Sequence, residues 1–190
     1  MEAPTFRLDN EHLSFRFTAT LSDRYGEPVE RLPTPKRLND WLDANSLRLG
    51  KEQTTDQDLV LACQLREAIH RAGTAVVGGD VPQRADIGLI NRLSRESRTY
   101  PQLTASGAHW CSWSRHPIHA ALGLIAQHAI AILGGDERSQ VKVCKNPECG
   151  GLYVDTSRGQ NRRWCSMNIC GNRAKKAKFR RADAQTPAHP

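Results

Sequence analysis

The 190-residue sequence lacks a long uninterrupted apolar run. Its longest apolar stretch, Ile118–Leu133, is interrupted by His119, Gln127 and His128. It is also shorter than the roughly 18 residues expected of a membrane-spanning helix. The N-terminal residues have no apolar run behind a basic start, which argues against a secretory signal peptide. We therefore expect a soluble, cytoplasmic protein that does not associate with a membrane.

The sequence also lacks the short motifs of common catalytic sites. It contains no G-x-S-x-G motif, no glycine-rich phosphate-binding loop and no paired acidic motif. His116 and His119 have a spacing compatible with a metal site, and His128 lies further along the same segment. No carboxylate lies near them in the sequence, so a second metal site or a catalytic site is not favoured. We do not expect an enzyme.

Positive charge is scarce in most of the chain and concentrated near its C-terminal end. The formal net charge is +7, from 27 Lys and Arg and 20 Asp and Glu. Residues 141–190 contain eleven basic and three acidic residues, hence +8, whereas residues 1–140 contain sixteen and seventeen, hence −1. A basic region confined to one segment is typical of a nucleic-acid-binding module. The alternative is a solvated basic tail that only aids solubility.

Hydrophobic periodicity and capping residues predict a mainly helical N-terminal region with short β elements. The alternation of Leu13, Phe15 and Phe17 with polar residues predicts a half-buried strand. A β-hairpin is expected to turn near Ser106-Gly107. The helix ending at Gly134-Gly135 is apolar all round, so we expect it at the centre of the core. The predicted helices begin after Thr34, after Thr55, at Pro82 and at Pro117.

Four cysteines lie in the basic segment with the spacing C-x4-C-x15-C-x4-C. They are Cys144, Cys149, Cys165 and Cys170. Two close cysteine pairs separated by a loop of this size supply the four tetrahedral ligands of a structural zinc site. Disulfides, an iron–sulfur cluster and free thiols are the alternatives, although disulfides are rare in the cytoplasm. Cys63 and Cys111 lie outside this cluster, and we expect them to be small buried apolar residues.

The cysteine-rich segment resembles the CGNR zinc finger, which is named for the tetrapeptide found here at Cys170–Arg173. The cysteine pairs, Tyr153-Val154-Asp155, Ser157-Arg158 and the basic stretch after Cys170 match that family together. The preceding region resembles the N-terminal domain that accompanies this finger in bacterial proteins, through Leu65-Arg66-Glu67 and the order of helices. It lacks the Asn-Thr pair that usually follows the first strand there. These bacterial proteins are regarded as stress-induced transcription regulators, so the resemblance implies DNA binding and regulation.

Within the finger, the pattern predicts a hairpin followed by a basic helix. Leu152–Val154 is expected to pair with Arg163–Cys165, and the helix to run from about Asn168 to Ala182. Arginine forks suit phosphates and guanine edges. The residues predicted to contact nucleic acid are Arg158, Arg162, Arg163, Arg173, Lys176, Arg180 and Arg181.

Together these features predict an α+β, mainly helical protein. It consists of an N-terminal helical domain (1–138), a four-cysteine zinc finger (139–182) and a disordered tail (183–190). We expect one structural Zn²⁺ per chain and a DNA-binding transcriptional regulator. Its N-terminal domain would sense a small-molecule effector or form a homodimer. The alternatives are a zinc-stabilised RNA-binding factor and a protein-interaction adaptor without direct DNA contact.

Overall fold

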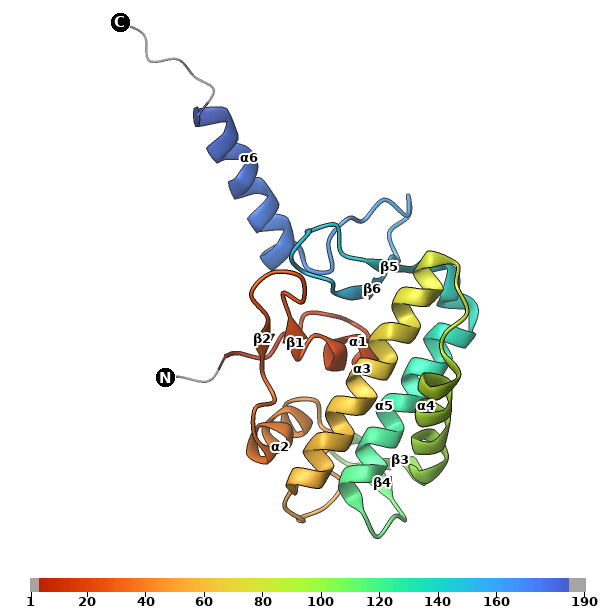
Figure 1. Cartoon of the computed structure of the whole chain (residues 1–190). Helices are drawn as coiled ribbons and strands as arrows, with labels where there is room; N and C mark the ends of the chain where they lie inside the picture. The colour runs from red at the N-terminus through yellow and green to blue at the C-terminus, as the bar shows by residue number, and fades with distance from the viewer. Residues whose placement is uncertain (1–3, 185–190) are drawn as a thin grey trace, which may run out of the picture.

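The computed structural model describes residues 4–184, except for the side chains of Lys178, Phe179 and residues 181–184. The α+β, mainly helical class is confirmed (Figure 1). The helices are α1 (Leu13–Thr18), α2 (Pro35–Ala44), α3 (Asp56–Gly78), α4 (Arg84–Glu96), α5 (Pro117–Gly134) and α6 (Asn172–Ala184). The strands form three antiparallel pairs: β1 (Leu21–Ser22) with β2 (Val29–Glu30), β3 (Thr99–Thr104) with β4 (Gly107–Ser112), and β5 (Val141–Val143) with β6 (Leu152–Val154). A 3-10 helix (Asp136–Gln140) precedes β5, and a π-helical turn (Met167–Gly171) precedes α6.

The apolar helix α5 lies in the centre of the core, as its sequence predicts. It packs against α1, α3 and α4. It has 18 residues and is apolar enough to cross a membrane by length and composition, but 61% of it is buried inside the protein. Gly123 allows α4 and α5 to approach closely, because a Cβ there would lie 2.5 Å from the carbonyl oxygen of Leu93. α5 is therefore a core helix.

The predicted starts of α2 and α3 are confirmed. The Thr34 hydroxyl accepts a hydrogen bond from the Arg37 N–H, and Pro35 begins α2. Thr55 and Asp58 form a reciprocal capping box at the start of α3, and Gly79 ends it with φ +80°. These features are local to the chain, so the sequence alone determines them.

The prediction of a strand at Leu13, Phe15 and Phe17 is wrong, because this segment forms α1. Phe15 and Phe17 are fully buried, and the Phe17 ring packs 5.1 Å from that of Trp41, centroid to centroid. In a helix, residues three apart share a face, so Ser14 and Phe17, and Phe15 and Thr18, all point into the core. Over six residues this pattern is hard to distinguish from alternation, and packing against α3 and α5 selects the helix.

Three smaller expectations also need correction. α4 begins at Arg84 rather than Pro82. Cys63 and Cys111 are half-buried rather than buried. His119 does have a carboxylate partner, because its Nε2 lies 3.2 Å from Asp58 Oδ1 at the start of α3.

The hairpin turn near Ser106-Gly107 is confirmed by the β3–β4 register.

The C-terminal part of the chain packs onto the N-terminal helices through β5 and β6. Val141, Leu152 and Val154 belong to the same buried core as α3 and α5. A Cβ on Gly73 of α3 would lie 2.5 Å from a Leu152 methyl group. The division after residue 138 falls within the 3-10 helix and stays a prediction. α6 extends to Ala184, two residues into the predicted tail, and residues 185–190 lie outside the described part, so the tail also stays a prediction.

Candidate metal centre and nucleic-acid interface

The four predicted zinc ligands come together in one buried cluster. The Sγ atoms of Cys144, Cys149, Cys165 and Cys170 all lie within 4.8 Å of one another. Cys165 Sγ lies 3.6 Å from Cys149 Sγ and 3.8 Å from Cys170 Sγ. Zinc–sulfur bonds of about 2.3 Å in a tetrahedron place the sulfurs about 3.8 Å apart. The cluster therefore fits one structural zinc ion held by four thiolates.

Tight turns position each cysteine pair. In the first pair, the Cys144 N–H donates to the Gly151 carbonyl (2.8 Å) and the Cys149 N–H to the Asn146 carbonyl (3.0 Å). We call residues 144–151 the zinc knuckle. In the second pair, Ser166 caps the π-helical turn by accepting a hydrogen bond from the Ile169 N–H. Because each turn is local and small, the metal supplies the cohesion that a larger apolar core would otherwise supply.

The predicted partner of Leu152–Val154 is wrong. β6 pairs with β5, in the register Lys142 with Tyr153, and not with Arg163–Cys165. The Arg163 carbonyl instead accepts a hydrogen bond from the Lys145 N–H, and the Tyr153 hydroxyl donates to the Arg162 carbonyl (2.6 Å). The sequence did not predict β5, the strand before the first cysteine. Its pairing with β6 and its contacts with α3 show that the finger begins with this strand.

Asp155 organises the loop that carries Arg158. Its buried carboxylate accepts hydrogen bonds from Lys142 Nζ (2.6 Å), from both the N–H and the hydroxyl of Ser157, and from the Arg162 N–H (2.9 Å). Burial alone would raise the pKa of Asp155, but these donors together hold that pKa well below its ordinary value. Arg158 itself is exposed at the loop tip.

Two of the predicted nucleic-acid contacts have structural partners instead of being free. Arg162 donates to the carbonyls of Trp164 (2.9 Å) and Cys165 (2.7 Å), and its guanidinium lies 4.8 Å from the centre of the Tyr153 ring. Arg173 forms a bidentate ion pair with Asp23 at 2.6 and 3.3 Å. The predictions that Arg162 and Arg173 contact nucleic acid stay predictions, although both side chains also bind within the protein.

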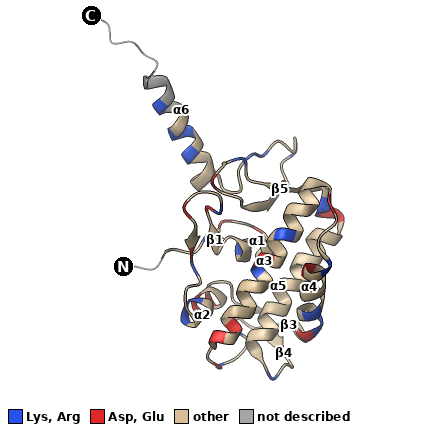
Figure 2. Cartoon of the chain, in the orientation of Figure 1, with Lys and Arg blue, Asp and Glu red and all other residues tan. Residues whose placement is uncertain are grey.

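Of the other predicted contacts, Arg158, Arg163, Lys176 and Arg180 are exposed. Arg163, Lys176 and Arg180 make no ion pair within the described residues. Arg163 lies over Trp164, 5.3 Å from its ring centre. The side chain of Arg181 lies outside the described residues. Figure 2 shows the basic residues of α6 on a helix that projects away from the rest of the molecule. A cavity of about 610 Å³ lies between the zinc knuckle and α6, bordered by Trp164, Lys176 and Arg180.

The N-terminal region holds the zinc knuckle through three hydrogen bonds. The N–H groups of Arg24 and Tyr25 donate to the carbonyls of Cys149 (3.2 Å) and Glu148 (3.0 Å). His70 Nε2 lies 2.8 Å from the Gly150 carbonyl oxygen, so Nε2 carries the proton. Burial and the nearby Arg24 charge lower the pKa of His70, which keeps the ring neutral near pH 7.

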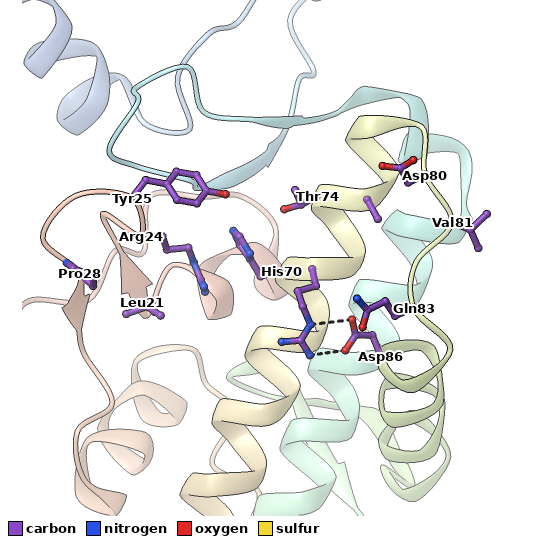
Figure 3. A pocket seen from close by; sticks show the side chains of 12 residues that line it. Leu21, Arg24, Tyr25, Pro28, His70, Thr74, Asp80, Val81, Gln83 and Asp86 are labelled. Atoms are coloured by element: carbon purple, nitrogen blue, oxygen red, sulfur yellow. Dashed lines mark hydrogen bonds and ion pairs between the residues drawn. The ribbon is translucent and has the colours of Figure 1, made fainter.

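These same residues line a hollow of about 580 Å³ between α3 and the turn after β1 (Figure 3). Arg71 and Asp86 form an ion pair at its edge, at 2.5 and 3.0 Å. The Thr74 hydroxyl is buried there and has no hydrogen-bond partner among the residues that the structure describes. No sequence signal identified Arg24, Tyr25 or His70, because their partners lie far away along the chain.

Two family models match this chain. Residues 11–136 match the ABATE family model, described as "Putative stress-induced transcription regulator". The chain belongs to the ABATE family. Residues 140–182 match the CGNR zinc finger, which confirms the resemblance and the assignment of the four cysteines to a zinc-binding finger. Neither description names an enzyme. No curated protein matches the chain.

Proposed function

We propose that this ABATE-family protein regulates transcription by binding DNA through its CGNR finger. The observation that carries the proposal is the placement of positive charge on α6. The helix starts at the zinc centre and projects away from the helical bundle, with Lys175, Lys176 and Arg180 exposed along it (Figures 1 and 2). A rigid basic helix that extends from a metal-stabilised base can lie along a phosphate backbone or in a groove.

The loop tip extends this surface. Arg158 and Arg163 are exposed, and the Asp155 hydrogen bonds hold their loop in one conformation. Together with Lys176 and Arg180 they make four candidate phosphate contacts. Arg162 and Arg173 serve the finger's own structure, so we assign them a positioning role. Arg181 stays a predicted contact. A cytoplasmic location fits a regulator that acts on bacterial DNA.

A salt titration of duplex binding by the full zinc-loaded chain tests this proposal. Each neutralised phosphate contributes about −0.9 to the slope of log affinity against log salt, so four contacts give a slope of about −4. Replacing Lys176 and Arg180 together by Ala should reduce the slope by about 2. The matched control replaces the exposed Lys51 and Arg84, which lie outside the finger, and should leave the slope unchanged.

Three outcomes would contradict the DNA assignment. An unchanged slope in the Lys176 and Arg180 variant would show that α6 does not contact the phosphates. Preference for structured RNA over duplex DNA would favour an RNA-binding factor. Failure to bind either nucleic acid at moderate salt would favour a protein-interaction adaptor.

We also infer that the N-terminal domain senses a small-molecule effector in the hollow beside the zinc knuckle. A ligand in this hollow would touch Tyr25 and His70, which donate hydrogen bonds to the knuckle. A Thr74→Phe substitution would fill part of the hollow and should change DNA affinity severalfold without loss of zinc. The control Val81→Phe places the same ring at the outer edge, where Val81 is 86% exposed. Equal DNA affinities in both variants would contradict sensing at this place.

Homodimer formation is a separate proposal. Two fingers on one duplex would bind more tightly than one, because the second contact becomes intramolecular. Light scattering of the full chain with and without duplex measures the stoichiometry directly, and a monomer in both conditions would reject it.

A further inference from the structure

A second basic hollow lies at the end of the helical bundle opposite the finger. Its volume is about 510 Å³. It is lined by the C-terminal end of α4, the segment between β4 and α5, and the first turn of α5. Figure 1 shows this end below, beside β3 and β4, with the finger above. A volume of this size is typical of small-molecule sites. Neither the family descriptions nor the proposed DNA contact involves this end of the molecule.

Four arginines border the hollow, and three of them have no partner. Within the described residues, the guanidinium groups of Arg95, Arg98 and Arg115 form no ion pair and no hydrogen bond. Two carboxylates offset part of the remaining charge: Glu96 lies 3.7 Å from Arg92, and Asp58 pairs with His119. Since like charges repel, a cluster of unpaired guanidinium groups favours a ligand with more than one negative charge.

Hydrogen bonds fix the backbone that borders the hollow. Arg98 has φ +43°, a left-handed conformation that non-glycine residues adopt only when their surroundings hold it. Its carbonyl accepts a hydrogen bond from the Trp113 N–H (3.1 Å). The Ser112 hydroxyl donates to the Ser97 carbonyl (3.2 Å), and the Ser114 hydroxyl accepts from the His116 N–H (3.1 Å). These hydrogen bonds fix the backbone that carries Arg98 and Trp113, whereas the guanidinium groups are free to turn toward a ligand.

An exposed tryptophan borders the same hollow. Trp113 is 76% exposed although one face of its ring stacks on Tyr100, with centroids 5.2 Å apart and an interplanar angle of 25°. Tyr100 holds the indole in place. An indole that stays in water beside a group of arginines can stack on the flat ring of a ligand.

We propose that this hollow binds a nucleoside diphosphate. The three unpaired arginines bind the phosphates, because a planar guanidinium group can donate two parallel hydrogen bonds to phosphate oxygens. The indole ring of Trp113 stacks on the base. The N-terminus of α5 borders the hollow and adds a partial positive charge, because the peptide dipoles of a helix point that way. The proposal does not depend on DNA binding by the finger.

Calorimetric titration of the full zinc-loaded chain with ADP and with pyrophosphate tests the proposal. We expect ADP to bind more tightly than pyrophosphate. Replacing Arg95 and Arg115 together by Ala should weaken both ligands at least tenfold. Trp113→Leu should weaken ADP severalfold and leave pyrophosphate unchanged. Circular dichroism and zinc content show whether each variant keeps its fold, and all three side chains are exposed in the native protein.

Two control variants locate the site. Arg84→Ala removes an exposed arginine from the same helix, α4, outside the hollow, and Lys176→Ala removes a basic residue of the finger. Neither should change ADP affinity. The proposal is overturned if ADP does not bind, if the Arg95 and Arg115 variant binds it as tightly as the native chain, or if ADP and pyrophosphate bind equally. Loss of duplex binding in that variant, without ADP binding to the native chain, would assign the arginines to a DNA surface instead.

Discussion

The ion pair between Arg173 and Asp23 should anchor α6 to the N-terminal region. These two residues are 150 positions apart in the chain, and they form two hydrogen bonds of 2.6 and 3.3 Å. Asp23 also pairs with Arg7 at 3.0 Å. Removing the anchor should therefore lower stability and loosen α6 without touching a zinc ligand.

The magnitude follows from the burial of the two partners. The Asp23 side chain is 9% exposed, whereas that of Arg173 is 46% exposed. Exposed pairs contribute about 0.2–1 kcal/mol, and hydrogen bonds to charged groups about 1.5–3 kcal/mol. Because solvent screens the Arg173 side, we expect a coupling free energy of about 1 kcal/mol. Asp23→Asn should cost more than Arg173→Gln, since it also leaves Arg7 without its partner.

A double-mutant cycle measures this coupling. The free energy of unfolding in urea is determined for the zinc-loaded native chain, Asp23→Asn, Arg173→Gln and the double variant. Independent sites are additive within about 0.3 kcal/mol, so additivity at that level would refute the anchor. Arg48→Gln with Asp43→Asn is a matched control, because that pair is 2.8 Å apart but more exposed, and its coupling should be smaller.

Three further predictions concern the metal, the core and pH. Chelation of zinc under reducing conditions should abolish amide-exchange protection over residues 144–171 and leave α3 and α5 protected; protection that survives chelation would show that the finger folds without metal. Phe17→Ala should cost about 3–5 kcal/mol in urea unfolding, because the ring is fully buried, whereas Val60→Ala at a 57% exposed position should cost little. Since the pKa of His70 is lowered in the folded chain, the unfolded chain binds the proton first, and stability should fall as the pH drops through about 6.5. His70→Gln keeps a donor for Gly150 and should flatten that slope; an unchanged slope would contradict the assignment.

The sequence by itself determined the features that depend on neighbouring residues. The zinc ligands follow from cysteine spacing, since two tight turns present two thiolates each. The start of α3 follows from Thr55 and its end from Gly79. The β3–β4 turn follows from Ser106-Gly107 in the same way. Hydrogen bonds within a few residues settle each of them, so tertiary contacts had little to add.

Only the tertiary structure decided the features that depend on distant partners. A short alternating segment became α1 because its two phenylalanines fill the core between α3 and α5. β6 pairs with β5 because both pack against α3. Arg173, which the sequence presents as one more basic residue of a nucleic-acid-binding helix, pairs with Asp23. Residues so far apart in the chain meet only when the core brings them together, and the free energy of that packing exceeds the weak local preferences that sequence patterns report.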